Sequence, residues 1–168
     1  MDAVYKKQIA FRMAVRASSG LYFIEDFLYR HSAEDGAFFR SLCILLSYSF
    51  ELLLKAQFVA TSEFNDKAEL ERSLKDLNHD ILKISAKLGS SKLNAIGINC
   101  VNPRSGTDFI GYDIVTIQGK KISVENFIDI RYDFTNDTLR DLPTNGEFTE
   151  WVTEALNVYG KIKKQHFS

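Results

Sequence analysis

The sequence predicts a mainly α-helical protein, an up-and-down bundle of four or five helices with one β-hairpin insertion. The stretch 40–60 is apolar nearly all round, which is typical of a helix in the core of a bundle. Two other stretches, 4–31 and 66–88, repeat their apolar residues at intervals of three and four, as one face of a helix requires. Only two prolines occur, Pro103 and Pro143, and both fall in predicted loops.

Length and composition limit the number of domains and the classes of partner and cofactor that are expected. A chain of 168 residues is expected to form a single domain, 1–168. Its net charge of −1 creates no field that would recruit nucleic acid or an anionic membrane. Cys43 and Cys100 have neither metal-ligand nor disulfide spacing, and no pair of histidines is spaced for a metal, so no metal and no cofactor is expected. The polar start, Met1 to Lys7, is unlike a signal peptide, so a cytoplasmic location is expected.

The first predicted helix, 4–31, carries its core stripe on residues spaced by threes and fours. These are Ala10, Met13, Ala17, Leu21, Ile24 and Leu28. Arg12 and Arg16 lie one turn apart on another side. They form either a solvated basic face or a phosphate contact.

The central helix, 40–60, is predicted to belong to a soluble bundle and not to a membrane. Its longest charge-free run, 41–50, is about half of the roughly 20 residues that a bilayer needs. Glu51 and Lys55 then follow, spaced as a favourable ion pair on a helix. Because the rest of this helix is apolar, we expect the pair to be partly buried and to need partners.

The third stretch, 66–88, shows a narrow seam that Gly89 is expected to end. The seam consists of Leu70, Leu74, Leu77, Ile81, Ile84 and Leu88. On one continuous helix, His79 lies opposite the seam, on the surface. Alternatively, Asn78 caps a fresh helix that begins at His79, and the break frees His79 and Asp80 to point elsewhere.

The periodicity changes after a loop-rich passage, 90–108. A hairpin is predicted over 109–124, with a two-residue turn at Gly119 and Lys120. In this register Ile117 faces Ile122, Val115 faces Val124 and Thr116 faces Ser123. Because a lone hairpin is marginally stable in water, it should lie on the bundle or meet a partner.

The C-terminal part is predicted to contain a short helical piece, 125–132, a turn-like run, 133–146, and a last amphipathic helix. Thr144 and Glu147 have the spacing of a capping box that opens this helix.

Three segments in order, SFELLLKAQFV, NHDILKI and FIDIRYDF, give the chain a resemblance to the HEPN superfamily over residues 42–134. The resemblance implies a four- or five-helix bundle that commonly forms a homodimer. Catalytic members of the family cut RNA with an R-x4–6-H motif. Arg131 fits the arginine of this motif, but no histidine follows, and Asn136 stands in that region instead. Asparagine can hydrogen-bond a phosphate but cannot shuttle a proton near neutral pH.

The candidate site is a polar cluster at one end of the bundle. Its predicted binding residues are Glu51, Lys55, His79, Asp80, Arg131, Tyr132 and Asn136. Partly buried charges that gather in this way tend to mark sites. In the alternative interpretation, Arg131 and Tyr132 are structural and tie a loop to a helix end, through Glu51 or Asp80.

Three functions follow. The first is a HEPN-like, non-catalytic binding and dimerisation module that engages RNA or a partner protein. The resemblance implies a role in a toxin–antitoxin or phage-defence system. A nucleotidyltransferase-type antitoxin is an example of the partner protein that it would bind. The second is a divergent, metal-independent ribonuclease toxin that uses Arg131 and His79 as catalytic residues. The third is a structural helical scaffold. The sequence contains none of the motifs of nucleotide-binding loops or of serine hydrolases.

Overall fold

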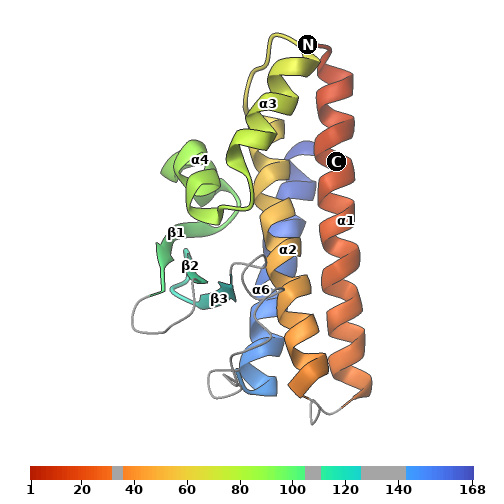
Figure 1. Ribbon diagram of the computed structural model, residues 1–168, viewed down its shortest axis with the longest axis vertical. Coiled ribbons are helices and arrows are strands. Elements are labelled where there is room, and N and C mark those ends of the chain that lie inside the picture. Colours follow the sequence, from red (N-terminus) through yellow and green to blue (C-terminus); the bar gives the residue numbers. More distant parts are fainter. Residues whose placement is uncertain (32–35, 105–110, 126–142) are drawn as a thin grey trace.

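A computed structural model of the chain describes residues 1–31, 36–104, 111–125 and 143–168. This part contains five helices and a small antiparallel sheet (Figure 1). The helices are α1 (Ala3–Arg30), α2 (Gly36–Thr61), α3 (Lys67–Leu77), α4 (Ile81–Ala95) and α6 (Asn145–His166). The strands are β1 (Ile98–Pro103), β2 (Gly111–Thr116) and β3 (Lys121–Glu125). The predicted fold class, mainly α with a β-hairpin insertion, is confirmed.

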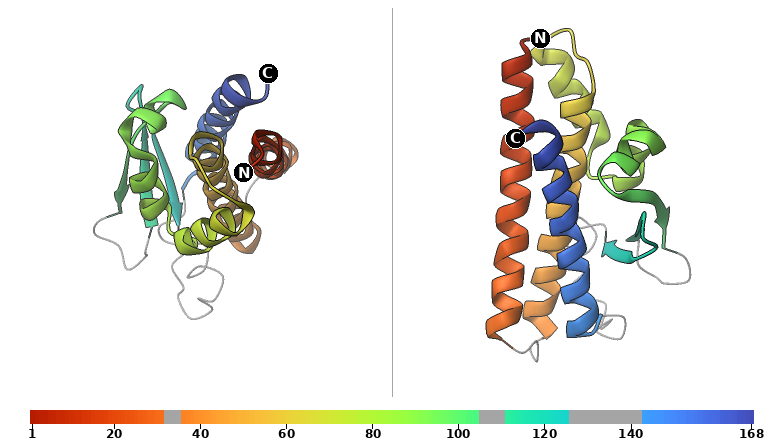
Figure 2. Two further views of the ribbon diagram at one scale, coloured as in Figure 1. Left: turned by 90° about the horizontal axis from the view of Figure 1, so that it is seen from above. Right: turned by 180° about the vertical axis from the view of Figure 1, so that it is seen from behind.

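Helix α2 is the central helix, as predicted. It lies between α1 and the sheet, with α6 beside it (Figures 1 and 2). Leu46, Phe50, Leu53 and Leu54 are almost completely buried. By length and hydropathy the segment Phe38–Thr61 could span a membrane, but 78% of its most apolar window is buried inside the protein. The core helix of a soluble domain has this property.

Helices α1 and α6 cover two sides of α2. Alanines at positions 10, 14 and 17 of α1 are fully buried, and such small side chains allow neighbouring helices to approach closely. Helix α6 opens with the predicted capping box: the hydroxyl of Thr144 accepts from the amide of Glu147, whose carboxylate accepts from the amide of Thr144. This prediction is confirmed.

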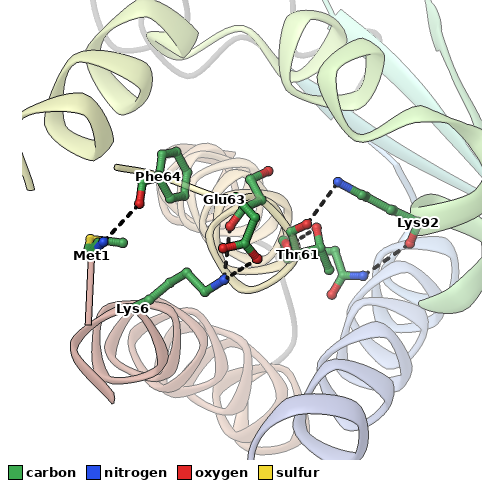
Figure 3. A network of polar contacts seen from close by, with 8 residues as sticks. Met1, Lys6, Thr61, Glu63, Phe64 and Lys92 are labelled. Carbon is green, nitrogen blue, oxygen red and sulfur yellow. Dashed lines mark hydrogen bonds and ion pairs between the residues drawn. The ribbon is translucent and has the colours of Figure 1, made fainter. Parts of the chain in front are cut away.

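Polar contacts close the end of the bundle at which α1 begins (Figure 3). The amino group of Met1 donates to the carbonyl of Phe64 at 3.2 Å, and Lys6 pairs with Glu63 at 3.1 Å. Lys92 of α4 donates to the carbonyl of Thr61 at 3.1 Å. These contacts attach the first turns of α1 and the last turn of α4 to the end of α2 and the residues that follow it.

The seam over 66–88 is divided between two helices. The chain leaves the helical conformation at Asn78 and resumes it at Ile81, so the continuous helix is wrong. At Gly89 (φ 74°, ψ 162°) the helical conformation ends, as predicted, and a second helical segment, still counted within α4, then continues to Ala95. Glycine adopts this backbone conformation without steric cost, so the chain can bend there and become helical again.

Strand β1 occupies part of the passage 90–108 that was predicted as a loop. It pairs with β2, and β2 pairs with β3, so the sheet has the order β1-β2-β3. The third strand gives the hairpin a partner within the chain, which a two-stranded ribbon would lack. The sequence did not predict this strand, because Gly97, Asn102 and Pro103 are typical of loops and interrupt the alternation of apolar and polar residues.

The predicted register of the hairpin is wrong by three residues. Ile122 faces Ile114 instead of Ile117, Val124 faces Tyr112 instead of Val115, and Ser123 faces Asp113 instead of Thr116. The loop is longer than two residues because the amide of Ile117 donates to the carbonyl of Gly97 at 2.9 Å, outside the hairpin. An odd shift exchanges the two faces of a strand. Ile114 and Thr116 are therefore buried, and Ile117 is half exposed.

The sheet is attached to the bundle by polar as well as apolar contacts. The amide of Glu125 donates to the hydroxyl of Ser47 in α2 at 3.1 Å. Lys120 pairs at 2.6 Å with Glu154, a buried residue of α6. Glu125 is the last residue of β3 and not the start of a helix, and the rest of the predicted piece 125–132 lies outside the described residues.

Candidate functional site

The site is built around a buried carboxylate on α2. Glu51 is only 2% exposed, because the helix that carries it is surrounded by the other elements of the bundle. One turn later, Lys55 places its Nζ 2.6 Å from Oε1 of Glu51, and its side chain is 12% exposed. A buried carboxylate requires such a partner, because removing it from water without compensation costs several kcal/mol. The expected partial burial of this pair is confirmed.

The break between α3 and α4 brings His79 to the same carboxylate. Its Nδ1 lies 3.1 Å from Oε2 of Glu51 and 3.2 Å from Oε1. The predicted alternative with a helix break is therefore confirmed, but the capping residue differs from the predicted Asn78. The fresh helix begins at Ile81, and its N-cap is Asp80, whose carboxylate accepts from the amide of Lys83 at 3.0 Å.

Lys55 also fixes the break itself. Its Nζ donates to the carbonyl of Asn78 at 2.6 Å. Asn78 has φ 49° and ψ −136°, a conformation that costs a residue other than glycine about 1–3 kcal/mol. The ammonium thus connects the buried carboxylate to a strained turn, and both help to hold His79 in place. We call Glu51, Lys55, Asn78 and His79 the Glu51 cluster.

The chemistry of the Glu51 cluster follows from its hydrogen bonds. A carboxylate only accepts, so the Nδ1 of His79 donates to it, and this assigns the proton of a neutral imidazole to Nδ1. A carboxylate that orients an imidazole in this way is also found where histidine acts as a base. The ring of His79 is 37% exposed, whereas Glu51 is closed off from solvent.

The structure brings together Glu51, Lys55 and His79 of the predicted site. Asp80 lies next to His79, but its carboxylate is used in the cap of α4. Arg131, Tyr132 and Asn136 lie outside the described residues. The predicted place at one end of the bundle is wrong, because Glu51 and Lys55 lie well before the end of α2 at Thr61. The break at Asn78 lies beside this part of α2, because Lys55 donates to the carbonyl of Asn78.

A second polar group lies between the sheet and the bundle, and the sequence did not predict it. The side chain of Arg104 is 15% exposed, with Nε 3.7 Å from Asp113 and Nη1 4.0 Å from Glu125. Ser123 donates to the same Asp113 carboxylate at 2.7 Å. Arg104 directly follows β1, so only knowledge of that strand would have placed it here.

A small pocket adjoins Arg104. Its lining comes from α2, the sheet, α6 and residues next to these elements: Cys43, Leu46, Ser47, Arg104, Ser123, Glu125, Pro143, Phe148 and Trp151. Burial raises the pKa of the Cys43 thiol to about 12, and the nearby carboxylate of Glu125 contributes to this increase. The thiol is therefore protonated at neutral pH and is a poor nucleophile.

Arg12 and Arg16 are exposed on α1, as the solvated alternative expects. Among the described residues, no three His, Cys, Asp or Glu side chains come together as a metal site would require. Comparison with known proteins adds no relative, because no protein family, curated protein or solved structure matches this chain.

Proposed function

We propose that this chain is a HEPN-like module that acts by binding RNA or a partner protein, without catalysis. The observation that carries the proposal is the state of the Glu51 cluster. Its one buried carboxylate is bound by both Lys55 and His79, so the charge is compensated inside the protein. Such a cluster fixes the shape of the surface around it, which a binding site needs.

The absence of the motif histidine from the sequence supports the same proposal. Arg131 occupies the position that the HEPN resemblance gives to the motif arginine, and Asn136 follows where a histidine would be expected. An arginine without a proton-transferring partner can still bind a phosphate or a carboxylate. A cytoplasmic location and a role in a toxin–antitoxin or phage-defence system belong to the proposal and rest on the resemblance.

The test measures binding and cleavage in the same samples. Fluorescently labelled single-stranded RNA is titrated with the purified chain, anisotropy reports binding, and a denaturing gel then reports whether the RNA is intact. We expect intact RNA throughout, and any binding should be weaker in Arg131→Ala than in the control Arg16→Ala. Cleavage that Arg131→Ala abolishes would overturn the proposal.

If RNA does not bind, the partner-protein arm is tested by co-expression. The protein encoded by the neighbouring gene is expressed with the tagged chain, and the two are purified through the tag. A nucleotidyltransferase-type antitoxin that co-purifies would identify the ligand as protein. If neither RNA nor the neighbouring protein binds, the proposed binding function is wrong and the structural helical scaffold is favoured.

One observation favours a second function, a divergent ribonuclease toxin that uses Arg131 and His79. The carboxylate of Glu51 holds the imidazole through Nδ1 while more than a third of the ring stays exposed. A histidine that acts as acid or base needs this combination of orientation and access. The assay compares His79→Ala with His31→Ala, an exposed histidine of the same chain. RNA cleavage that is lost only in His79→Ala would establish the enzyme.

A further inference from the structure

The outer side of α1 carries a row of exposed apolar side chains. Val4, Phe11, Val15, Tyr22 and Tyr29 are all between 38% and 91% exposed. At 3.6 residues per turn they fall within an arc of about 40° on the helix, about a third of a turn away from the buried alanines. We call these five residues the α1 stripe. Phe11 also packs within the chain, against the ring of Phe167, with the ring centroids 5.3 Å apart.

The position of α1 leaves the α1 stripe accessible. Figures 1 and 2 show α1 at the margin of the bundle, with α2 between it and the sheet. The helix has 28 residues and is therefore about 42 Å long. Exposed apolar side chains that share one line along a helix of this length indicate an interaction surface.

The spacing of the α1 stripe matches a second copy of itself in the antiparallel direction. If the two-fold axis passes near the middle of the helix, Val4 lies opposite Tyr29 of the second copy, and Phe11 lies opposite Tyr22 of the second copy. Val15, closest to the axis, lies opposite the small side chain of Ser18. Contacts that repeat in this reciprocal way are the mark of a two-fold interface.

The charges beside the α1 stripe favour the same arrangement. Lys7 and Glu25 are exposed and flank the stripe on one side, eighteen residues and hence five turns apart. In the antiparallel pairing, Lys7 of each copy lies beside Glu25 of the other. On the other flank, Gln8 lies beside Asp26. A parallel pairing would instead place the basic ends together and the acidic ends together, which is unfavourable.

We propose that the α1 stripe binds the α1 stripe of a second copy, antiparallel, with two symmetric Lys7–Glu25 pairs at its edge. This surface is separate from the Glu51 cluster, and the proposal does not depend on the proposed function. The apolar contacts would supply most of the affinity, and the two ion pairs would set the direction.

The first experiment measures molar mass in solution by light scattering and sedimentation at micromolar concentrations. The wild-type chain should be a dimer. Tyr22→Arg should raise the dissociation constant at least a hundredfold, because it places two charges in the apolar interface. The matched control is Phe23→Arg, which changes a neighbouring exposed aromatic outside the stripe and should leave the dimer intact. Circular dichroism checks that both variants remain folded.

The second experiment tests the direction. Lys7→Glu or Glu25→Lys alone should weaken the dimer about tenfold, and the double variant should restore it. In a Cys100→Ser background, mixing Val4→Cys with Tyr29→Cys should give a disulfide-linked pair, whereas Tyr29→Cys alone should not.

A wild-type chain that stays monomeric would overturn the proposal, as would a Tyr22→Arg dimer as tight as the wild type. A monomer that binds anionic lipid vesicles through the α1 stripe would also overturn it and would assign the surface to a membrane. Cross-linking of Tyr29→Cys with itself would contradict the antiparallel direction.

Discussion

Glu51 shows how a single residue can be interpreted correctly from its neighbours in the sequence and still leave its partners undecided. The i, i+4 spacing to Lys55 within an apolar helix predicted a partly buried pair, because both residues belong to the same helix. His79 could not be assigned to Glu51 in this way, since its position depends on whether the helix around it breaks. Arg104 was missed altogether, because its partners Asp113 and Glu125 come from other strands.

Removing the buried carboxylate should destabilise the protein strongly. Glu51→Ala leaves Lys55 and His79 without their shared acceptor, and we expect the free energy of unfolding to fall by about 3 kcal/mol. The control is Glu71→Ala, which removes a 58%-exposed partner of Lys67 and should change the free energy by less than about 0.5 kcal/mol. Urea denaturation measures both. Equal effects would show that Glu51 is not held as described.

The thiol of Cys43 should resist alkylation in the folded protein. Its pKa is raised to about 12, so at pH 8 almost no thiolate forms, whereas the partly exposed Cys100 should react first. Because the folded pKa lies above the ordinary thiol value of 9.0, the stability that Cys43 contributes is complete below pH 9 and is lost as the pH rises toward 12. Mass spectrometry after iodoacetamide treatment locates the label. Equal labelling of both cysteines at pH 8 would contradict the burial of Cys43.

Among the elements, those with local signals could be predicted and those with long-range causes could not. The helices α1, α2 and α6 follow from apolar periodicity and, for α6, from the capping box of Thr144 and Glu147. The register of β2 against β3 was wrong because the loop is set by Gly97, which is distant in the sequence. The break after α3 was one of two alternatives, since the apolar seam continues through it without a change of phase.

At the strained turn, substitution by glycine should stabilise the protein, whereas glycine substitutions within helices usually destabilise it. Asn78→Gly should raise the free energy of unfolding by about 1 kcal/mol, because glycine adopts φ 49° and ψ −136° without strain. Asn94→Gly, within the last turn of α4, should lower it by a few tenths of a kcal/mol. Thermal unfolding at neutral pH compares the two. A loss of stability in Asn78→Gly would mean that the turn is not strained.

The start of α6 depends on a single side chain. Thr144→Ala removes the acceptor for the amide of Glu147 and should cost about 1 kcal/mol of stability. Thr153→Ala, at an exposed position in the middle of the same helix, is the control and should be neutral or slightly stabilising. A thermal scan of both variants provides the measurement. No difference between them would argue against the capping box.

For the whole molecule, the sequence was sufficient to predict that helices surround α2, but not how α3, α4 and the sheet are arranged on it. Those elements are placed by contacts between distant parts of the chain, such as Lys55 with the carbonyl of Asn78. The Glu51 cluster is the clearest of these long-range connections. Both proposed functions depend on it, because it fixes the surface around it and positions the partly exposed ring of His79.

The most direct test is a double-mutant cycle between Glu51 and His79, measured by urea unfolding at neutral pH. Glu51→Ala, His79→Ala and the double variant are compared with the wild type. Direct contact at 3.1 Å predicts a coupling energy of about 1 kcal/mol or more, because a hydrogen bond to a buried charge is lost only once in the double variant. Losses that add to within about 0.3 kcal/mol would show that the two residues do not interact and would contradict the assignment of the site.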